Sequence, residues 1–307
     1  MIELTSAQAR RLRLRAQLLG GSELSPAGVV RRAGAMQGQD RNAVLRAIAL
    51  RSRPGTTTAD VRAAFDSGEL VRGWPMRGTL FAISPADLAG IVAVTGPRMA
   101  TALRGRRRFL GLSDADFELA RAVAIEALDA RPHSRAELAG RWAEAGVPQG
   151  SGHDYHFTST LAITGVLALG PFDGKEQLVV RLPPAEEDEA AFLVRFVTAF
   201  YAARGPATID DLAWWTKLPK GVLTAAVDAV EGLERVSVEG REMRYLDDGV
   251  VAPEPPRELE VPAFDEWILG YQDRSLTASP EVMKDIATVN GIFRSARIVD
   301  GVVVGRA

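Results

Sequence analysis

The sequence predicts a helix-rich α+β fold, made of three tandem winged-helix units and a small C-terminal segment that contains β structure. The first observation is a repeated helix-start signal, in which a hydroxyl residue is followed three positions later by an acid, at Thr57, Ser134 and Thr208. The second is that each signal is followed by two short extended runs with turn formers near their join. Helices followed by a β-hairpin are the element order of a winged helix.

The repeated signal has a physical basis in helix capping. The hydroxyl can accept a hydrogen bond from the first turn, and the carboxylates of Asp60, Glu137 and Asp211 favour the positive end of a helix. The three starts lie 77 and 74 residues apart. One such signal is common, but three at near-equal spacing predict repeated units.

Periodicity and turn formers place the other elements. We expect a long helix before each signal, at about 40–52, 113–130 and 186–204, and another after the second and third, at about 157–165 and 219–232. The paired extended runs are 69–74 with 77–83, 166–170 with 177–182, and 233–239 with 242–246. Their joins contain Gly73 and Pro75, residues 171–174, and Gly240. In the first unit the third helix is either 25–36, displaced earlier, or 57–67 itself.

Five segments follow from this pattern. They are an N-terminal helix (1–24), the first winged-helix unit with following helices (25–112), the second unit (113–183), the third unit (184–249), and a connector with the C-terminal β segment (250–307). Four prolines in 250–262 exclude a helix interior there. Asp300-Gly301 between apolar residues predicts a final hairpin at 298–304.

Composition excludes several classes of protein. The 307 residues are 47% hydrophobic, enough for a sizeable core, yet no apolar run reaches the roughly 18 residues of a transmembrane helix. The N-terminus lacks the apolar stretch of a secretion signal. Cysteine is absent, which excludes disulfides, thiolate metal sites and a cysteine nucleophile. We therefore expect a cytoplasmic protein with no membrane partner and no cofactor.

The net charge of −2 hides an asymmetry. Residues 1–113 carry 18 arginines, no lysine and seven acidic residues, a net charge of +11, and the remainder carries −13. A basic third on a nearly neutral chain favours one face that binds a polyanion such as DNA. The alternative is uneven surface charge without a partner.

Two stretches of this basic region are candidates for DNA contact. The first is the predicted hairpin with Arg72, Trp74, Arg77 and Thr79, and the second is the run Arg104, Arg106, Arg107 and Arg108. Arginine offers charge and a fork of donors to phosphate, and tryptophan offers a face for stacking. The alternatives are a core tryptophan under a turn and a solvated, basic helix end.

Histidines and amides supply the remaining candidates. His153 and His156 could share a helix face, but no third ligand accompanies them, so we predict capping or core roles and no metal site. Gln37 and Gln39 lie two apart at a break before a helix. Taken alone, they are most simply polar loop residues, with Asp40 as the N-cap of that helix.

Five short motifs follow one another along nearly the whole chain. They are Gln37-Gly38-Gln39; Arg72-x-Trp74-x-Met76-Arg77-Gly78-Thr79-Leu80; His156-Phe157; Arg204-Gly205-Pro206-Ala207-Thr208 with Asp211-Leu212-Ala213-Trp214-Trp215; and Phe264-Asp265-Glu266-Trp267-Ile268-Leu269-Gly270-Tyr271-Gln272-Asp273-Arg274-Ser275. Each is weak by itself, but the five in this order resemble the AlkZ/YcaQ family of DNA glycosylases.

The resemblance implies three winged helices around a basic channel, and a catalytic pair that falls on Gln37 and Gln39. It also adds His156 to the residues expected to contact DNA. It implies a monomeric, monofunctional glycosylase that removes N7-alkylguanine from double-stranded DNA, and some members of the family also unhook interstrand crosslinks. Gly38 departs from the family's usual apolar middle residue, and Phe81 from its usual histidine. Relatives continue for tens of residues beyond Gly305, so a short or truncated C-terminal segment is expected.

Two amides can suffice for such a reaction because N7-alkylguanine is cationic and leaves without a proton. The enzyme then needs only to place a water near the anomeric carbon and to face the developing positive charge, which an amide carbonyl can do. The competing hypothesis is a winged-helix DNA-binding protein or transcription regulator without chemistry. A protein–protein scaffold is a third, and it would show no salt-dependent affinity for DNA.

Overall fold

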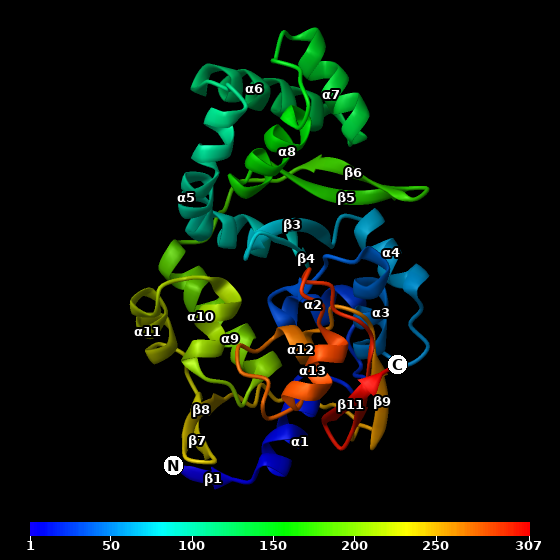
Figure 1. Cartoon of the computed structure of the whole chain (residues 1–307), viewed down its shortest axis with the longest axis vertical. Coiled ribbons are helices and arrows are strands. Elements are labelled where there is room, and N and C mark those ends of the chain that lie inside the picture. The colour runs from blue at the N-terminus through cyan, green and yellow to red at the C-terminus, as the bar shows by residue number, and fades with distance from the viewer. The chain divides into compact units, whose positions relative to one another are not determined.

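The computed structural model describes residues 1–307, in thirteen helices and eleven strands (Figure 1). The predicted helix-rich α+β class is therefore confirmed. Contacts divide the chain into unit 1, which joins Met1–Val61 to Ala190–Ala307, and unit 2, which is Arg62–Glu189. None of the helices combines the length and the apolar character that crossing a bilayer requires.

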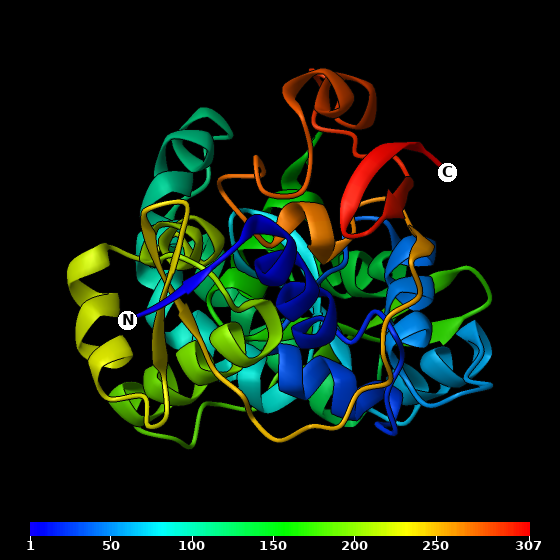
Figure 2. The same cartoon turned by 90° about the horizontal axis from the view of Figure 1, so that it is seen from below.

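Unit 1 brings the two ends of the chain together. Its helices are α1 (Ser6–Ala16), α2 (Pro26–Ala33), α3 (Arg41–Arg51), α9 (Glu189–Arg204), α10 (Ile209–Thr216), α11 (Lys220–Asp228), α12 (Glu266–Leu269) and α13 (Pro280–Ile286). Its strands are β1 (Ile2–Leu4), β2 (Met36–Gln37), β7 (Glu234–Val238), β8 (Arg241–Tyr245), β9 (Glu258–Val261), β10 (Ala296–Val299) and β11 (Val302–Arg306). Strand β1 pairs in parallel with β7 of the β7–β8 hairpin, and β9, β10 and β11 form a second, antiparallel sheet (Figure 2).

Unit 2 is built from helices around antiparallel strands. Its helices are α4 (Thr58–Asp66), which begins in the last residues of unit 1, α5 (Pro85–Phe109), α6 (Asp114–Ala130), α7 (Arg135–Glu144) and α8 (His153–Ile163). Its strands are β3 (Val71–Met76), β4 (Thr79–Ile83), β5 (Leu167–Asp173) and β6 (Glu176–Arg181). They pair in the order β4-β3-β5-β6.

The three predicted helix-start signals are all confirmed as capping boxes. At each one the hydroxyl accepts a backbone N–H and the acid three residues later accepts the N–H of the capping residue, at Thr57, Ser134 and Thr208. Two orphan donors are satisfied reciprocally at each helix start. The same chemistry therefore fixes where α4, α7 and α10 begin.

The hairpins form where they were predicted, but two joins lie further along the chain. Gly73 and Pro75 lie inside β3, and the turn is at Arg77-Gly78, with φ of 61° and 69°. Residues 171–173 likewise extend β5, and the turn is at Gly174-Lys175. The predicted turns at Gly240 and at Asp300-Gly301 are confirmed. Two consecutive positive φ angles make a turn whose twist matches that of paired strands, so the turn dipeptide determines the join.

Helices followed by a hairpin occur three times in the chain, which agrees with the predicted element order. The winged-helix interpretation and the five segment boundaries stay predictions. Both alternatives for the extra helix of the first unit form, as α2 and α4. The predicted connector is partly wrong, because its last residues form β9. The prolines lie outside the bounds of β9, so they remove no hydrogen bond from the strand.

Each unit has a hydrophobic core of its own. In unit 2 it surrounds Trp142 and Phe157, and the Trp142 indole donates to the carbonyl of Ala120 over 2.9 Å. In unit 1 one cluster surrounds Trp267 and joins α1 to the sheet of β9, β10 and β11. Trp267 belongs to α12, whose first residue carries the carboxylate that contacts the predicted catalytic segment.

Candidate active site

Gln37 is at the end of β2, in a segment whose path is set by a glycine. Gly34 ends α2 with a φ of 73°, and a Cβ atom there would come within 3.2 Å of the Phe196 ring. The chain then runs through β2 and reaches Asp40, which caps α3 by accepting the Ala43 N–H over 2.8 Å. The sequence predicted a break before a helix, with Asp40 as the N-cap of that helix, and both are confirmed.

Burial differs between the two predicted catalytic glutamines. Gln37 is 5% exposed, whereas Gln39 is exposed. Gly38 between them is buried and is not among the residues with a positive φ. An L-amino acid could therefore adopt the backbone angles of Gly38 without left-handed strain.

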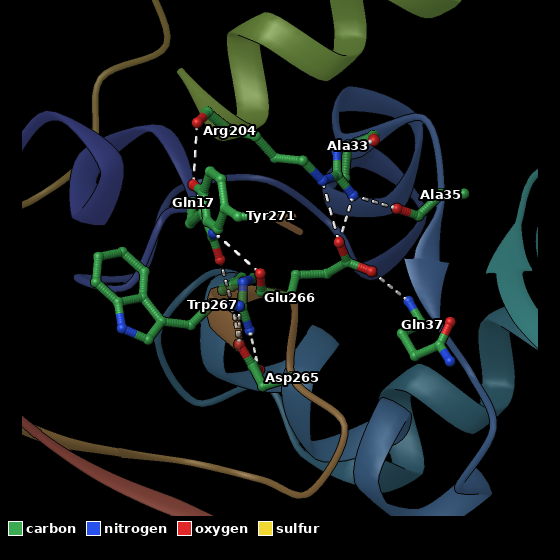
Figure 3. A network of polar contacts seen from close by, with 10 residues as sticks. Gln17, Ala33, Ala35, Gln37, Arg204, Asp265, Glu266, Trp267 and Tyr271 are labelled. Carbon is green, nitrogen blue, oxygen red and sulfur yellow. Dashed lines mark hydrogen bonds and ion pairs between the residues drawn. The ribbon is translucent and has the colours of Figure 1, made fainter. Parts of the chain in front are cut away.

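The segment that carries Gln37 is held by a buried ion pair (Figure 3). The Gln37 N–H donates to Glu266 Oε1 over 2.7 Å, and Glu266 Oε2 accepts from Arg204 Nε and Nη2 over 3.0 and 2.8 Å. Arg204 also donates to the carbonyls of Ala33 and Ala35, each over 2.8 Å. Three backbone groups within five residues are thus held by one charged pair.

A second buried ion pair lies beside the first. Arg51 of α3 donates to both oxygens of Asp265 over 2.9 and 2.7 Å. Gln17 links the two pairs, since its side chain accepts from Arg51 and donates to the Glu266 carbonyl and the Tyr271 hydroxyl. We call Gln17, Arg51, Arg204, Asp265, Glu266 and Tyr271 the buried polar network.

Tyr271 acts in this network as a neutral donor. Its hydroxyl donates to the Arg204 carbonyl over 3.0 Å, and Arg13 lies 3.8 Å from the ring centroid. Burial raises the pKa of Tyr271, and burial also lowers the pKa of Arg13. The phenol therefore stays protonated and keeps its hydrogen bond at neutral pH.

The buried polar network does not enclose a substrate site. Its cavity has a volume of about 20 Å³, room for a single water molecule. Its polar groups are directed at one another and at the backbone of 33–37. Arg204 and Glu266 of this network can therefore shape the segment that carries Gln37, but the network cannot itself receive a nucleobase.

All the predicted DNA-contacting residues belong to unit 2. Arg72 and Trp74 lie in β3 and are only 8% exposed, and Trp74 packs in the core of the unit. Arg77 is at the turn of the β3–β4 hairpin and is half-buried, as is Thr79 at the start of β4. The hairpin therefore presents Arg77 more openly than the two residues before it.

Two adjoining cavities bring the remaining candidates together. The arginine cavity, of about 550 Å³, lies between α5, α6 and α8, and its charged and polar lining includes Arg104, Arg107, Asp114, Glu118, Arg121, His156 and Thr160. The aromatic cavity, of about 430 Å³, is lined by Trp74, Arg106, Tyr155 and His156 among others. Arg108 lines neither. The end of α5 from Pro97 onward contains five arginines and no acid, so this wall is positively charged.

The arginines of the arginine cavity differ in how far they are engaged. Arg107 forms an ion pair with Asp114 and lies 4.4 Å from the Phe117 ring centroid. Arg104 is exposed and, like Arg121, forms no ion pair or hydrogen bond. These two guanidinium groups are available to an anion from outside the chain.

His156 lies on the wall that both cavities share. It is 3% exposed, it packs edge-on against Phe117, and its Nε2 has no hydrogen-bond partner. Burial, and then the charges of Arg106 and Arg107, lower the pKa of His156, so the ring is neutral at neutral pH. A neutral imidazole can still donate or accept one hydrogen bond toward a ligand.

Sequence reasoning missed several of these residues as members of a site. Arg121, Thr160 and Tyr155 line the cavities, but none of them was singled out from the sequence. Arg204, Asp265 and Glu266 were noticed only as parts of motifs. Two consecutive acids at the start of a helix, Asp265 and Glu266, with Trp267 directly after them, were the available signal of buried carboxylates.

The comparison with family models decides what the chain is. The model described as DNA glycosylase AlkZ-like matches residues 30–307, which include Gln37, all of unit 2 and nearly all of the buried polar network. The chain belongs to the AlkZ-like DNA glycosylase family. It is accordingly a DNA glycosylase, an enzyme that hydrolyses N-glycosyl bonds in DNA.

The fold agrees with that of an AlkZ-like glycosylase of known structure. The structure of Streptomyces sahachiroi DNA glycosylase AlkZ matches with a TM-score of 0.82 over 99% of this chain and 87% of that chain, at 20% identity. No curated protein sequence matches this chain. At this identity the AlkZ structure establishes the fold alone, and the chemistry has to be argued from the residues present.

Proposed function

We propose that this AlkZ-like glycosylase excises cationic N7-alkylguanine from double-stranded DNA with a water molecule positioned by Gln37 and Gln39. The observation that carries the proposal is the placement of Gln37, whose backbone is held by a buried ion pair in a segment whose one carboxylate, Asp40, caps α3. Glutamine cannot accept a proton at any accessible pH, but its carbonyl can orient a water and face a cation.

The proposed step balances without an acid. The water oxygen attacks C1′ of the deoxyribose, the C1′–N9 bond breaks, and its electron pair moves into the base. That electron pair neutralises the positive charge of the alkylated guanine, and the water's proton leaves to solvent. A neutral purine would need protonation first, so we expect it to be a poor substrate.

The residue types favour a monofunctional enzyme. A glycosylase that also cleaves the strand needs an amine nucleophile, and the chain has only four lysines, at 175, 217, 220 and 284. A side-chain amide cannot form a Schiff base. We therefore expect the reaction to stop at an abasic site. We also expect one protein molecule to bind the duplex. Unhooking of interstrand crosslinks at N7 would be the same bond cleavage on a larger adduct.

The arginine cavity is the proposed contact with the DNA backbone. Arg104 and Arg121 have no partner within the chain, and Thr160 Oγ1 and His156 Nε2 are unpartnered polar atoms in the same cavity. Phosphate oxygens fit this set of donors, because arginine binds them with a fork of N–H groups. Asp114 and Glu118 of α6 also line this cavity, so a bound phosphate would lie against the arginines and away from these two carboxylates.

The test is release of 7-methylguanine from a duplex with enzyme in excess. Wild type should release it, and Gln37→Ala and Gln39→Ala should each slow release by roughly 10- to 100-fold with nearly unchanged DNA affinity, because the amides act in the transition state. Gln149→Ala is the matched control, since that amide bonds only to its own loop, at the Val147 carbonyl. Release that survives both substitutions would place the chemistry elsewhere. Binding without any release by wild type would favour a DNA-binding protein without glycosylase chemistry.

A further inference from the structure

One ion pair holds three backbone groups within the five residues that end at Gln37. Arg204 holds the carbonyls of Ala33 and Ala35, and Glu266 holds the N–H of Gln37. The two side chains come from the end of α9 and the start of α12, and both converge on β2 (Figure 3).

We propose that Arg204 and Glu266 are positioning residues for the glutamine motif, Gln37-Gly38-Gln39. They fix the backbone that leads into the motif, and so help to keep the two side-chain amides in the positions that the reaction requires. The inference rests on the proposed function of Gln37 and Gln39. It goes beyond that function because neither Arg204 nor Glu266 reaches substrate. Their role is to reduce the number of backbone conformations that the motif can adopt.

The geometry leaves the pair little freedom. Arg204 is 1% exposed, and its guanidinium lies 4.1 Å from the Trp215 ring centroid. Every polar contact of the pair ends on backbone or on the partner, so a shift of either side chain would break several hydrogen bonds at once. A buried ion pair is weak evidence for stability, since an apolar pair can replace one. An apolar pair could not, however, orient three peptide groups.

Gly38 explains why the motif needs such support. A glycine between the two glutamines offers no side chain to pack and has more backbone freedom than any other residue. Because Gly38 cannot anchor the motif, the anchoring falls on the residues before it. The charge-assisted hydrogen bond to Glu266 is made by Gln37, the residue directly before this glycine.

The chain contains a matched control for this role. Arg51 and Asp265 form a second buried pair, 4% and 0% exposed, joined by two hydrogen bonds. Asp265 is the neighbour of Glu266 in sequence, yet its pair contacts Ala47, Gln17 and the start of α12 and no atom of 33–37. Both pairs should matter for folding, and only one should matter for the motif.

The experiment compares Glu266→Gln with Asp265→Asn in the full chain. For Glu266→Gln we expect the single-turnover excision rate to fall roughly 10- to 100-fold with little change in DNA affinity, because misplacement by about 1 Å can cost about 100-fold. For Asp265→Asn we expect a change below about threefold at equal occupancy of the folded state. Arg204→Lys keeps the positive charge but loses the several N–H donors of the guanidinium. Its excision rate should fall by about as much as that of Glu266→Gln.

A spectroscopic measurement separates positioning from general damage. In wild type the Gln37 N–H should exchange slowly with solvent, and its proton resonance should be shifted downfield by the carboxylate. Both features should be lost in Glu266→Gln and kept in Asp265→Asn. Rapid exchange of Gln37 in wild type would overturn the inference even if neither variant folded.

The outcomes also separate this inference from the proposed function. If Gln37→Ala leaves excision intact, the proposed function fails. If Gln37→Ala abolishes excision but Glu266→Gln and Asp265→Asn are equally active, the function stands and the positioning role is wrong.

Discussion

In unit 1, Arg51 and Arg204 are buried and each is paired with a carboxylate at 2.7–2.8 Å, whereas in unit 2 Arg104 and Arg121 line an open cavity and form no ion pair. A buried arginine without its carboxylate would carry an uncompensated charge, while a cavity arginine is solvated until an anion arrives. The arginines of a basic sequence are therefore of two kinds: buried arginines that are paired with carboxylates, and cavity arginines that are open to an external anion. Substitutions should separate them cleanly.

The largest effect is expected from Arg204→Met, which leaves Glu266 buried and unpaired. Breaking such a pair should lower the free energy of unfolding by about 3–5 kcal/mol. The matched substitution Arg104→Met removes an exposed charge and should change it by less than about 0.5 kcal/mol. Denaturant unfolding of the two variants measures both values. Equal losses would end the distinction between the two kinds of arginine.

DNA binding should show the reverse order. The double variant Arg104→Met, Arg121→Met should bind a duplex several-fold more weakly, and its slope of log affinity on log salt should be shallower by about one per lost phosphate contact. Wild type should show a slope of roughly −0.9 per phosphate contacted. Fluorescence anisotropy across a salt series gives both slopes. A flat salt dependence in wild type would contradict DNA binding through these charges.

The hairpin turn of unit 2 offers a smaller test. Arg77→Asn removes the charge but suits the left-handed conformation at φ of 61°, and Asn-Gly is a favoured dipeptide for this turn. We expect DNA affinity to fall by roughly two- to fivefold with unchanged stability, as for one phosphate contact at the edge of an interface. A lower melting temperature with unchanged affinity would instead assign Arg77 to the fold.

The smallest effect concerns pH and His156. Because the pKa of His156 in the folded protein is below its ordinary value of 6.5, the unfolded chain binds a proton first as the pH falls. The titration of His156 should therefore not lower the free energy of unfolding of wild type above pH 6.5, and should lower it as the pH falls below 6.5. His156→Gln should lose less stability between about pH 7.5 and about pH 5.5. Equal losses would mean that His156 titrates normally.

The sequence predicted the elements better than the site because elements depend on neighbours. Capping residues three apart and dipeptides such as Asp300-Gly301 determine local structure directly, and these predictions are confirmed. The two misplaced joins have a local cause as well. The pairing of β3 with β4 is irregular between Gly73 and Met76, and such an irregularity lets a glycine or a proline lie inside a strand, so Gly73 and Pro75 did not mark the turn that Arg77-Gly78 makes.

The candidate site was harder because its partners are distant in sequence. Gln37 and Glu266 are 229 positions apart, and no periodicity connects them. Charge counting also misled, since it gave Arg51, which is buried and paired, the same weight as Arg104, which lines a cavity. Only resemblance to a family marked both ends of the buried network, and the contact between them required the structure.

The separation of Gln37 from Glu266 by 229 positions has a consequence for biosynthesis. At a translation rate of about 5–20 residues per second, the glutamines leave the ribosome roughly 10–50 s before the carboxylate that holds them. During that interval the nascent chain has its arginine-rich third and can adhere to nucleic acid, but its glutamine motif lacks the hydrogen bond from Glu266. An unfinished chain is therefore expected to leave DNA bases intact, and excision should begin only once translation has passed α12 and unit 1 has closed around β2.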